Sequence, residues 1–527
     1  MKKILSMLLV LAMSVSLFTA CATEEETSGP DKSGTDAITD APEDSSDDTA
    51  ESTEPVELAE INVIYWTLNT VPTDLLKVEE AINAITEPEI GVTVHLNVMD
   101  MGTYLTQASL MVSNSEKVDL MPTFPAASAH FASMASQGML TPLNDLLTEY
   151  CQDLVAILPE YYLNATTREG NVLAVPSYKN LVRDQYWVCR SSVLEGAGLT
   201  VEDIKTVEDI EKALIAIKEA YPDMVPLGGN AKTTNLTYPS FGPILGGYYD
   251  ALGETTAVAA SVSYDDATYS VVNRYETEEW KADIEVLKKW YDLGLIDKDL
   301  ANSEGNAEAL SDSTVASSFV VMNQAKKEQF DTTINDKLSY VKLQDGTIST
   351  GALTQMTWAI PTSATEPEAA AKYLNMLYTD ERILNLMDYG LEGDHYVKNA
   401  DGTIGYPEGI DATNSGYYIG MNEIIGNAFL AYPWEGSNPD SAKIGQEIMQ
   451  NAKASPLLGF SLDTSPVNDI YAQLTSICND QYRPALACGS APAGYQDEFI
   501  KALNDAGIKD YIAEAQRQLN EWLAANK

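Results

Sequence analysis

The chain has 527 residues, of which 45% are hydrophobic, and its 78 acidic against 32 basic side chains give a formal net charge of -46. A surface with this charge repels nucleic acid, anionic lipid and polyanionic sugars, so we expect a neutral partner. Only three histidines are present and no CxxC pair occurs, which argues against a zinc site. No metal and no other cofactor is expected.

The N-terminal residues have the layout of a secretory signal. MKK is followed by about sixteen mostly apolar residues from Ile4 and by small residues before Cys21. The apolar run is short and interrupted by serines, so we expect removal rather than membrane spanning. SVSLFTAC, Ser14 to Cys21, resembles a bacterial lipobox, with Phe18 where leucine is usual. The resemblance implies that residues 1–20 are removed and that Cys21 is the lipid anchor; the alternative is a secreted protein with an incidental cysteine.

Residues 21–60 are predicted to form a disordered acidic tether behind the lipidated cysteine. From residue 22 to residue 60 there are 14 Asp or Glu against one Lys, and no aromatic residue. Such a segment cannot bury a core. A flexible chain of this length spans roughly 35 Å, and charge repulsion extends it further. We therefore expect the folded body to stay attached to a membrane surface while standing clear of it.

Strand and helix patterns alternate at the start of the body. Strands are predicted at 61–66, 92–98 and 118–122, and helices at 73–84 and 103–112. This alternation favours a parallel sheet covered by helices, in which ligands bind beyond the carboxyl ends of the strands. The residues at those ends are Trp66, Asn69, Asp100 and Phe124.

The body is too long for one core, which predicts two lobes. The chain is expected to cross between them near Pro176 to Asn180, after the apolar VLAV. A second crossing is predicted near Pro361, where a strand ends before a helix that Pro367 opens. Between these points, amphipathic helices begin near Val207 and Trp280, and ASSFVVMNQ at 316–324 reads as a strand.

The order of these segments, together with VPSYK, GALTQMTWAIPTSATEPEAAAKYLNMLYTDE, YGLEGDHY and the closing GFSLD and FIKALNDAGIKDYIAEAQRQLNEW, resembles one family. It is similar to the extracellular solute-binding proteins of bacterial ABC importers, sugar-binding family 1-like, in the long lipoprotein branch with a C-terminal domain of once-unknown function. The resemblance implies a type II α/β fold of two lobes, each a mainly parallel sheet covered by helices. Lobe 1 would comprise residues 61–177 with about 356–425, and lobe 2 residues 178–355 with about 426–527.

The same resemblance implies the function. The protein would capture a neutral mono- or oligosaccharide between the lobes and deliver it to the membrane permease of an ABC importer without chemical change. We expect a monomer held by the lipid on Cys21 at the extracellular face of the cell membrane. No nucleic acid partner is expected.

The composition suits a sugar site, because pyranose rings need flat aromatic faces edged by polar groups. The chain has 28 Tyr and 7 Trp against 9 Phe. The family likeness places YGLEGDHY at or near the site, with Glu392 as a hydroxyl acceptor. For every aromatic candidate, packing in the core is the alternative. The complete set of predicted ligand-binding residues is Trp66, Asn69, Asp100, Phe124, Tyr178, Trp187, Tyr248, Trp358, Tyr389, Glu392 and Trp434.

Four cysteines remain besides Cys21. Cys478 and Cys488 are close enough in sequence to bridge a loop, which would leave Cys151 with Cys189. Four buried thiols are equally compatible, because a chain of this size needs no disulfides for stability.

Two other functions stay open at this point. A surface-anchored glycoside hydrolase would also place carboxylates in an aromatic cleft, but 78 acidic residues make accidental pairs common. GxSxG, HExxH and Walker A motifs are absent, and DGTIGYPEGID at 401–411 lacks calcium-loop spacing and predicts a hairpin turn at Asp401-Gly402. A peptide-binding lipoprotein would share the aromatic composition but is usually longer.

Overall fold

The computed structural model describes residues 58–125, 128–229, 248–253, 259–302, 309–420 and 424–526. The predicted signal, Cys21 and the tether up to residue 57 lie outside the described residues. None of the helices within the described ranges is long and apolar enough to cross a membrane.

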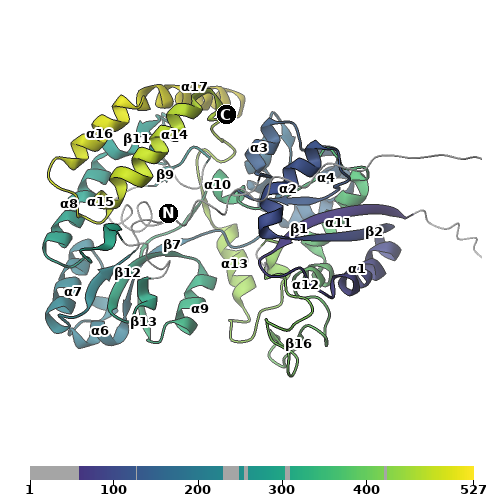
Figure 1. The fold of residues 1–527 in the computed structure, drawn as a ribbon, viewed down its shortest axis with the longest axis horizontal. Coiled ribbons are helices and arrows are strands. Elements are labelled where there is room, and N and C mark those ends of the chain that lie inside the picture. Colours follow the sequence, from purple (N-terminus) through teal and green to yellow (C-terminus); the bar gives the residue numbers. More distant parts are fainter. Residues whose placement is uncertain are drawn as a thin grey trace, which may run out of the picture. The chain divides into compact units, whose positions relative to one another are not determined.

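The first three predicted strands are confirmed, and they are parallel. β1 and β2 pair in register from Ala59 opposite Val92 to Thr67 opposite Asp100, and they lie side by side in Figure 1. On its other side β1 forms a parallel bridge from Val63 to Leu120. The elements of this first part are β1 (Ala59–Thr67), α1 (Leu75–Ile90), β2 (Val92–Asp100), α2 (Met101–Ser113), β3 (Met121–Thr123), α3 (Phe131–Ser136), α4 (Asn144–Tyr150) and α5 (Gln152–Ile157).

Both predicted crossings lie in one small antiparallel sheet, in the order β3-β15-β6. Thr357 of β15 pairs with Pro176 on one side and with Thr123 on the other, where the two threonine hydroxyls are 2.8 Å apart. The elements around this sheet are β4 (Thr167–Arg168), β5 (Asn171–Val172), β6 (Val175–Pro176), α10 (Thr350–Leu353), β15 (Thr357–Ala359), α11 (Pro367–Thr379), α12 (Glu381–Tyr389), β16 (Val397–Lys398), β17 (Ile404–Gly405) and α13 (Ser441–Gln450).

A second, four-stranded sheet has the order β13-β7-β12-β8. β12 is parallel to β8, but β7 is antiparallel to both of its neighbours, so this sheet is mixed rather than mainly parallel. β12 and β13 are joined through one helix and run in the same direction, and β7 lies between them in the opposite direction. Its elements are β7 (Asp184–Arg190), α6 (Ser191–Gly196), α7 (Val207–Ala220), β8 (Val225–Gly228), α8 (Glu278–Asp292), β12 (Val315–Met322), α9 (Gln324–Thr333) and β13 (Leu338–Gln344).

The C-terminal helices cover a third group of strands. α14 and α16 both contact α17, the long yellow helix in Figure 1, and α17 also contacts β11. The elements are β9 (Tyr249–Asp250), β10 (Ala260–Ser263), β11 (Val272–Asn273), β14 (Thr347–Ile348), β18 (Lys453–Ala454), α14 (Asn468–Ser476), α15 (Arg483–Ala487), α16 (Tyr495–Asp505) and α17 (Ile508–Asn526).

Buried side chains divide into separate cores, as two lobes require. The largest contains residues between 61 and 182, residues between 348 and 425, and Met449. Further cores are built from residues between 187 and 338 with Cys488, and from residues between 252 and 519. Trp280 and Trp290 lie in these cores. The chain therefore has a two-lobed α/β fold. The lobe boundaries in sequence stay a prediction.

The cysteines resolve the question that the sequence leaves open. Cys151, Cys189, Cys478 and Cys488 are all free and buried. Cys478 and Cys488 belong to two different cores, which separates the pair that is closest in sequence. Burial raises the pKa of each thiol to about 12, so these groups stay neutral and unreactive.

Candidate functional site

The carboxyl ends of the parallel strands bring four of the predicted residues to one edge. Trp66 is the next-to-last residue of β1, and Asn69 lies two residues beyond that strand. Asp100 ends β2, and Phe124 directly follows β3. The Trp66 ring is fully buried, 5.4 Å from the Phe124 ring and 4.7 Å from the Tyr104 ring. Phe124 itself is half-buried, so the buried indole supports an aromatic ring that reaches solvent. We call Trp66, Asn69, Asp100 and Phe124 the strand-edge site.

Asp100 supplies a fixed carboxylate at this edge. It is exposed and caps α2, accepting hydrogen bonds from the backbone N–H of Thr103 at 3.0 Å and from its hydroxyl at 2.6 Å. These bonds lower the pKa of Asp100, so the group is ionised at neutral pH. Each carboxylate oxygen retains a second lone pair that can accept a hydrogen bond from a ligand hydroxyl.

Asn69 supplies an exposed amide at the same edge. Its backbone N–H donates to the Thr67 hydroxyl at 3.0 Å, and that hydroxyl donates to the carbonyl of Ile419 at 3.1 Å. A Cβ placed on Gly420 would lie 2.8 Å from Asn69 Nδ2, so the amide packs against the backbone of that glycine. The segment around 419 is thereby fixed beside the strand edge.

Tyr178 and Trp358, which lie near the two predicted crossings, are buried. Tyr178 exchanges backbone hydrogen bonds with Gly426 and Ala428, and its ring lies 4.9 Å from that of Phe429. The Trp358 indole N–H donates to the carbonyl of Ile424 at 2.9 Å. Both residues therefore contact the segment 424–429. They support the site from within the core, and a direct contact with ligand stays a prediction.

The two candidates between residues 178 and 355, Trp187 and Tyr248, have different environments. Trp187 in β7 is fully buried in the core that also holds Trp290. Tyr248 is half-buried and stacks on Tyr264, with ring centroids 5.8 Å apart. The amine of Lys453 lies 4.1 Å from the Tyr248 ring centroid, so a cation occupies one approach to that ring. The structure does not bring either residue into contact with the strand-edge site.

The last three candidates meet in a separate cluster. The rings of Tyr389 and Trp434 are 5.7 Å apart, and the Tyr389 hydroxyl donates to the carbonyl of Tyr432 at 3.1 Å. Glu392 is exposed and forms an ion pair with Lys398 at 3.5 Å. The hairpin predicted at Asp401-Gly402 is confirmed in this cluster, since β16 and β17 pair antiparallel across that turn.

Several aromatic residues that the sequence did not single out accompany these candidates. Tyr406 lies 4.8 Å from Trp434, Tyr432 lies 6.0 Å from Tyr396, and Tyr418 is half-buried beside Gly420. The only sequence signal was the hairpin turn that precedes Tyr406. Their neighbours come from distant parts of the chain, which periodicity cannot reveal.

A polar depression of about 800 Å³ lies elsewhere, between the end of α9 and the start of β13. Its one aromatic side chain, Tyr340, donates to Asp331 at 2.6 Å, and Lys327 lies 4.4 Å from the ring centroid. Side chains of the protein itself therefore already contact the hydroxyl and the ring of Tyr340. We do not assign a ligand to this depression.

With this geometry in place, comparisons with known proteins define the class. A family model described as bacterial extracellular solute-binding protein matches residues 80–391, which is more than half of the chain. The chain belongs to this family, whose members bind solutes outside the cytoplasm. A second model, described as a domain of unknown function (DUF3502), matches residues 456–524, the segment that contains α14 to α17.

Individual relatives point in the same direction. A carbohydrate ABC transporter substrate-binding protein of Streptococcus pneumoniae is 25% identical over 453 residues, which is 84% of this chain and 87% of that protein. The crystal structure of the N-glycan transport solute binding protein (NgtS) from Streptococcus pneumoniae has a TM-score of 0.73 and 22% identity, and covers 89% of this chain and 100% of its own. An extracellular solute-binding protein from Bifidobacterium longum subsp. infantis has a TM-score of 0.60 and 14% identity over 89% and 99% of the two chains. These structures confirm the two-lobed type II fold.

Proposed function

We propose that this protein is the substrate-binding lipoprotein of an ABC importer and that it captures a neutral oligosaccharide. The observation that carries the proposal is the strand-edge site, where the half-buried Phe124 ring stands on buried Trp66 beside an amide and a carboxylate. An aromatic face with hydrogen-bonding groups at its rim matches a pyranose, which has apolar faces and a rim of hydroxyls. The carbohydrate transporter relative supports the same ligand class.

Charge supports a neutral rather than an anionic sugar. The net charge of -46 opposes the approach of uronate or sulfated chains. At the strand edge itself, ionised Asp100 would repel a carboxylated sugar but accept a hydrogen bond from a hydroxyl.

Binding without hydrolysis fits the state of Asp100. A glycosidase needs one carboxylic acid that stays protonated to donate to the leaving oxygen. Asp100 has the opposite character, since its hydrogen bonds with Thr103 lower its pKa. Asp388, whose pKa burial raises strongly, is fully enclosed and cannot reach a ligand. We propose that the sugar leaves the protein chemically unchanged.

Delivery follows from differential affinity. Ligand contacts with both lobes would favour a closed form, which the permease of the importer then receives. In this proposal a lipid on Cys21 keeps the monomer at the extracellular face of the membrane, because two acyl chains hold a protein stably where one does not. Mass spectrometry of the N-terminal peptide should find a diacylglyceryl thioether on Cys21. An unmodified Cys21, or a mature chain that starts elsewhere, would contradict the anchor.

The ligand class can be tested with the full-length mature protein and a panel of neutral and acidic oligosaccharides. A bound sugar stabilises the folded state by about 2.7 kcal/mol at 100 times its Kd, so a neutral sugar should raise the Tm. Chromatography of the incubated sugar should show no smaller products. A Tm that rises only with acidic sugars or peptides, or release of shorter sugars, would overturn the proposal.

A further inference from the structure

The aromatic cluster around Trp434 is held by backbone pairing with the β16–β17 hairpin. We call residues 389–420 and 424–436 the hairpin region. The backbone N–H of Ile404 donates to Pro433 at 2.8 Å, and that of Glu435 donates to Ile404 at 2.7 Å, so residues 433–435 run beside β17. Tyr389, Tyr396 and Ile404 form a small core of their own. This frame holds Trp434 in place without burying it.

The hairpin region presents aromatic rings with a polar rim. Tyr406, Tyr432 and Trp434 are all half-buried. Tyr406 meets Trp434 edge to face, with ring centroids 4.8 Å apart and an interplanar angle of 69°. The Lys398 amine donates to the Tyr432 hydroxyl at 3.2 Å and pairs with exposed Glu392. The hairpin region therefore resembles the strand-edge site, because both place polar side chains next to an aromatic ring.

Residues 417–420 of the hairpin region lie beside the strand-edge site. The backbone N–H of Leu68 donates to Ile419 at 3.3 Å, and Asn69 packs against Gly420. On the other side, the Tyr418 ring lies beside Gly420, and the Tyr406 ring lies beside Trp434. Burial, with a smaller contribution from Tyr418, raises the pKa of Tyr406 to about 12. Exposed Asn69 and half-buried Tyr418 thus flank Gly420, and half-buried Tyr406 and Trp434 form a pair on the hairpin region.

We propose that Tyr406, Tyr418 and Trp434 form a distal subsite for a further pyranose unit of the same oligosaccharide. The inference rests on the proposed function and deepens it, because it makes the ligand longer than a disaccharide. A disaccharide would occupy the strand-edge site alone. A longer neutral chain would extend along residues 418–420 and stack its far unit at Trp434.

The test is isothermal titration of the full-length mature protein with Man1GlcNAc and with Man5GlcNAc, a short and a long neutral probe. The wild-type protein should bind the long probe more tightly, by about ten-fold or more, since a buried aromatic contact commonly contributes this much. Trp434→Ala and Tyr406→Ala should each remove most of this difference and leave affinity for Man1GlcNAc unchanged. Tyr340→Ala, which removes a half-buried tyrosine outside both sites, is the matched control and should change neither affinity.

Thermal unfolding of each variant shows whether the hairpin region has lost its structure, and Tyr406→Phe separates ring stacking from hydroxyl contacts. Equal affinity of the wild-type protein for the two probes would overturn the inference, as would variants that weaken both probes alike. A wild-type protein that binds neither probe also overturns it as stated. The proposed function is judged separately, by whether any neutral sugar of the larger panel raises the Tm.

Discussion

Two tryptophans predicted as ligand contacts, Trp358 and Trp434, lie in regions of opposite character. Trp358 is fully buried in the largest core, where its indole N–H is bonded to Ile424. Trp434 is half-buried on the hairpin region and contacts Tyr389 and Tyr406. The same residue type therefore stabilises the fold in one region and presents a ring to solvent in the other. Only a ring with an accessible face can stack on a sugar.

The largest effect should come from the core. Trp358→Ala removes a buried indole and leaves a cavity, so we expect the free energy of unfolding to fall by about 3 to 5 kcal/mol. Urea denaturation measures this loss. Trp434→Ala should cost far less, because that side chain is only partly buried. An equal loss of unfolding free energy in the two variants would contradict the different roles assigned to Trp358 and Trp434.

A smaller effect is expected at the strand edge, on binding rather than stability. Phe124→Ala should weaken sugar binding by about 1 to 2 kcal/mol, because the ring that stands on Trp66 is lost while the Trp66 side chain stays in place. Isothermal titration with the sugar that raises the Tm most is the measurement. Phe124→Tyr keeps the ring and serves as the control. Unchanged affinity in Phe124→Ala would remove the strand edge from the site.

Asp388 offers a pH-dependent test of the core. Burial raises its pKa well above the usual range, and both carboxylate oxygens lack a hydrogen-bond partner. The folded state therefore prefers the protonated acid, and wild-type stability should fall as the pH rises from about 4, the value for an unfolded Asp, through the raised pKa. Asp388→Asn should flatten this slope and gain about 1 kcal/mol at neutral pH. A variant that shows the same slope would contradict this assignment.

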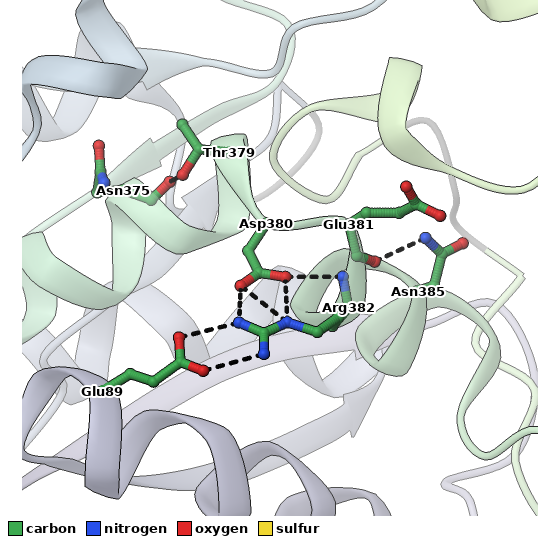
Figure 2. Close-up of polar contacts among 7 residues, drawn as sticks. All are labelled: Glu89, Asn375, Thr379, Asp380, Glu381, Arg382 and Asn385. Carbon is green, nitrogen blue, oxygen red and sulfur yellow. Dashed lines mark hydrogen bonds and ion pairs between the residues drawn. The ribbon is translucent and has the colours of Figure 1, made fainter.

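The smallest effect should come from the ion pairs in Figure 2. Arg382 binds both carboxylate oxygens of Glu89 at 2.9 Å and also contacts Asp380, which links α1 to the start of α12. The side chains of Arg382 and Glu89 are about half exposed, so Arg382→Ala should lower the free energy of unfolding by about 0.5 to 1 kcal/mol, and less at high salt. Denaturation at low and high ionic strength checks both statements. A loss as large as that of Trp358→Ala would contradict them.

Asn385 joins the largest core to the hairpin region. It is buried, and its amide donates to Glu381 at 2.7 Å, as Figure 2 shows. The same amide donates to the carbonyl of Leu430 at 2.9 Å. Its side-chain oxygen accepts the backbone N–H of Tyr432 at 2.8 Å. A residue of α12 thus fixes the segment that precedes Trp434. The exposed aromatic region depends on the buried one for its position.

The sequence predicts the strand edge well because alternation of strands and helices determines which strand ends meet. It could not predict which rings are accessible there. Residues 63 to 66 of β1 are buried on both faces, so alternation along the strand does not tell whether Trp66 points to ligand or core. The same holds for Trp358 in β15, where every residue is buried.

In the hairpin region, the sequence predicts the local turn but not the long-range contacts. Its turn at Asp401-Gly402 is a local signal and is predicted correctly. The approach of Tyr406 to Trp434 depends on backbone pairing between Ile404 and residues 433–435, about thirty positions later. No periodic pattern records such a contact, and Tyr406, Tyr418 and Tyr432 were therefore not among the predicted site residues.

A crystal structure of the protein with the neutral oligosaccharide that raises its Tm most would show directly where the sugar binds. We expect an intact sugar with one ring on Phe124 and with hydroxyls bonded to Asp100 and Asn69. A sugar bound away from the strand edge, or one cleaved in the crystal, would contradict it.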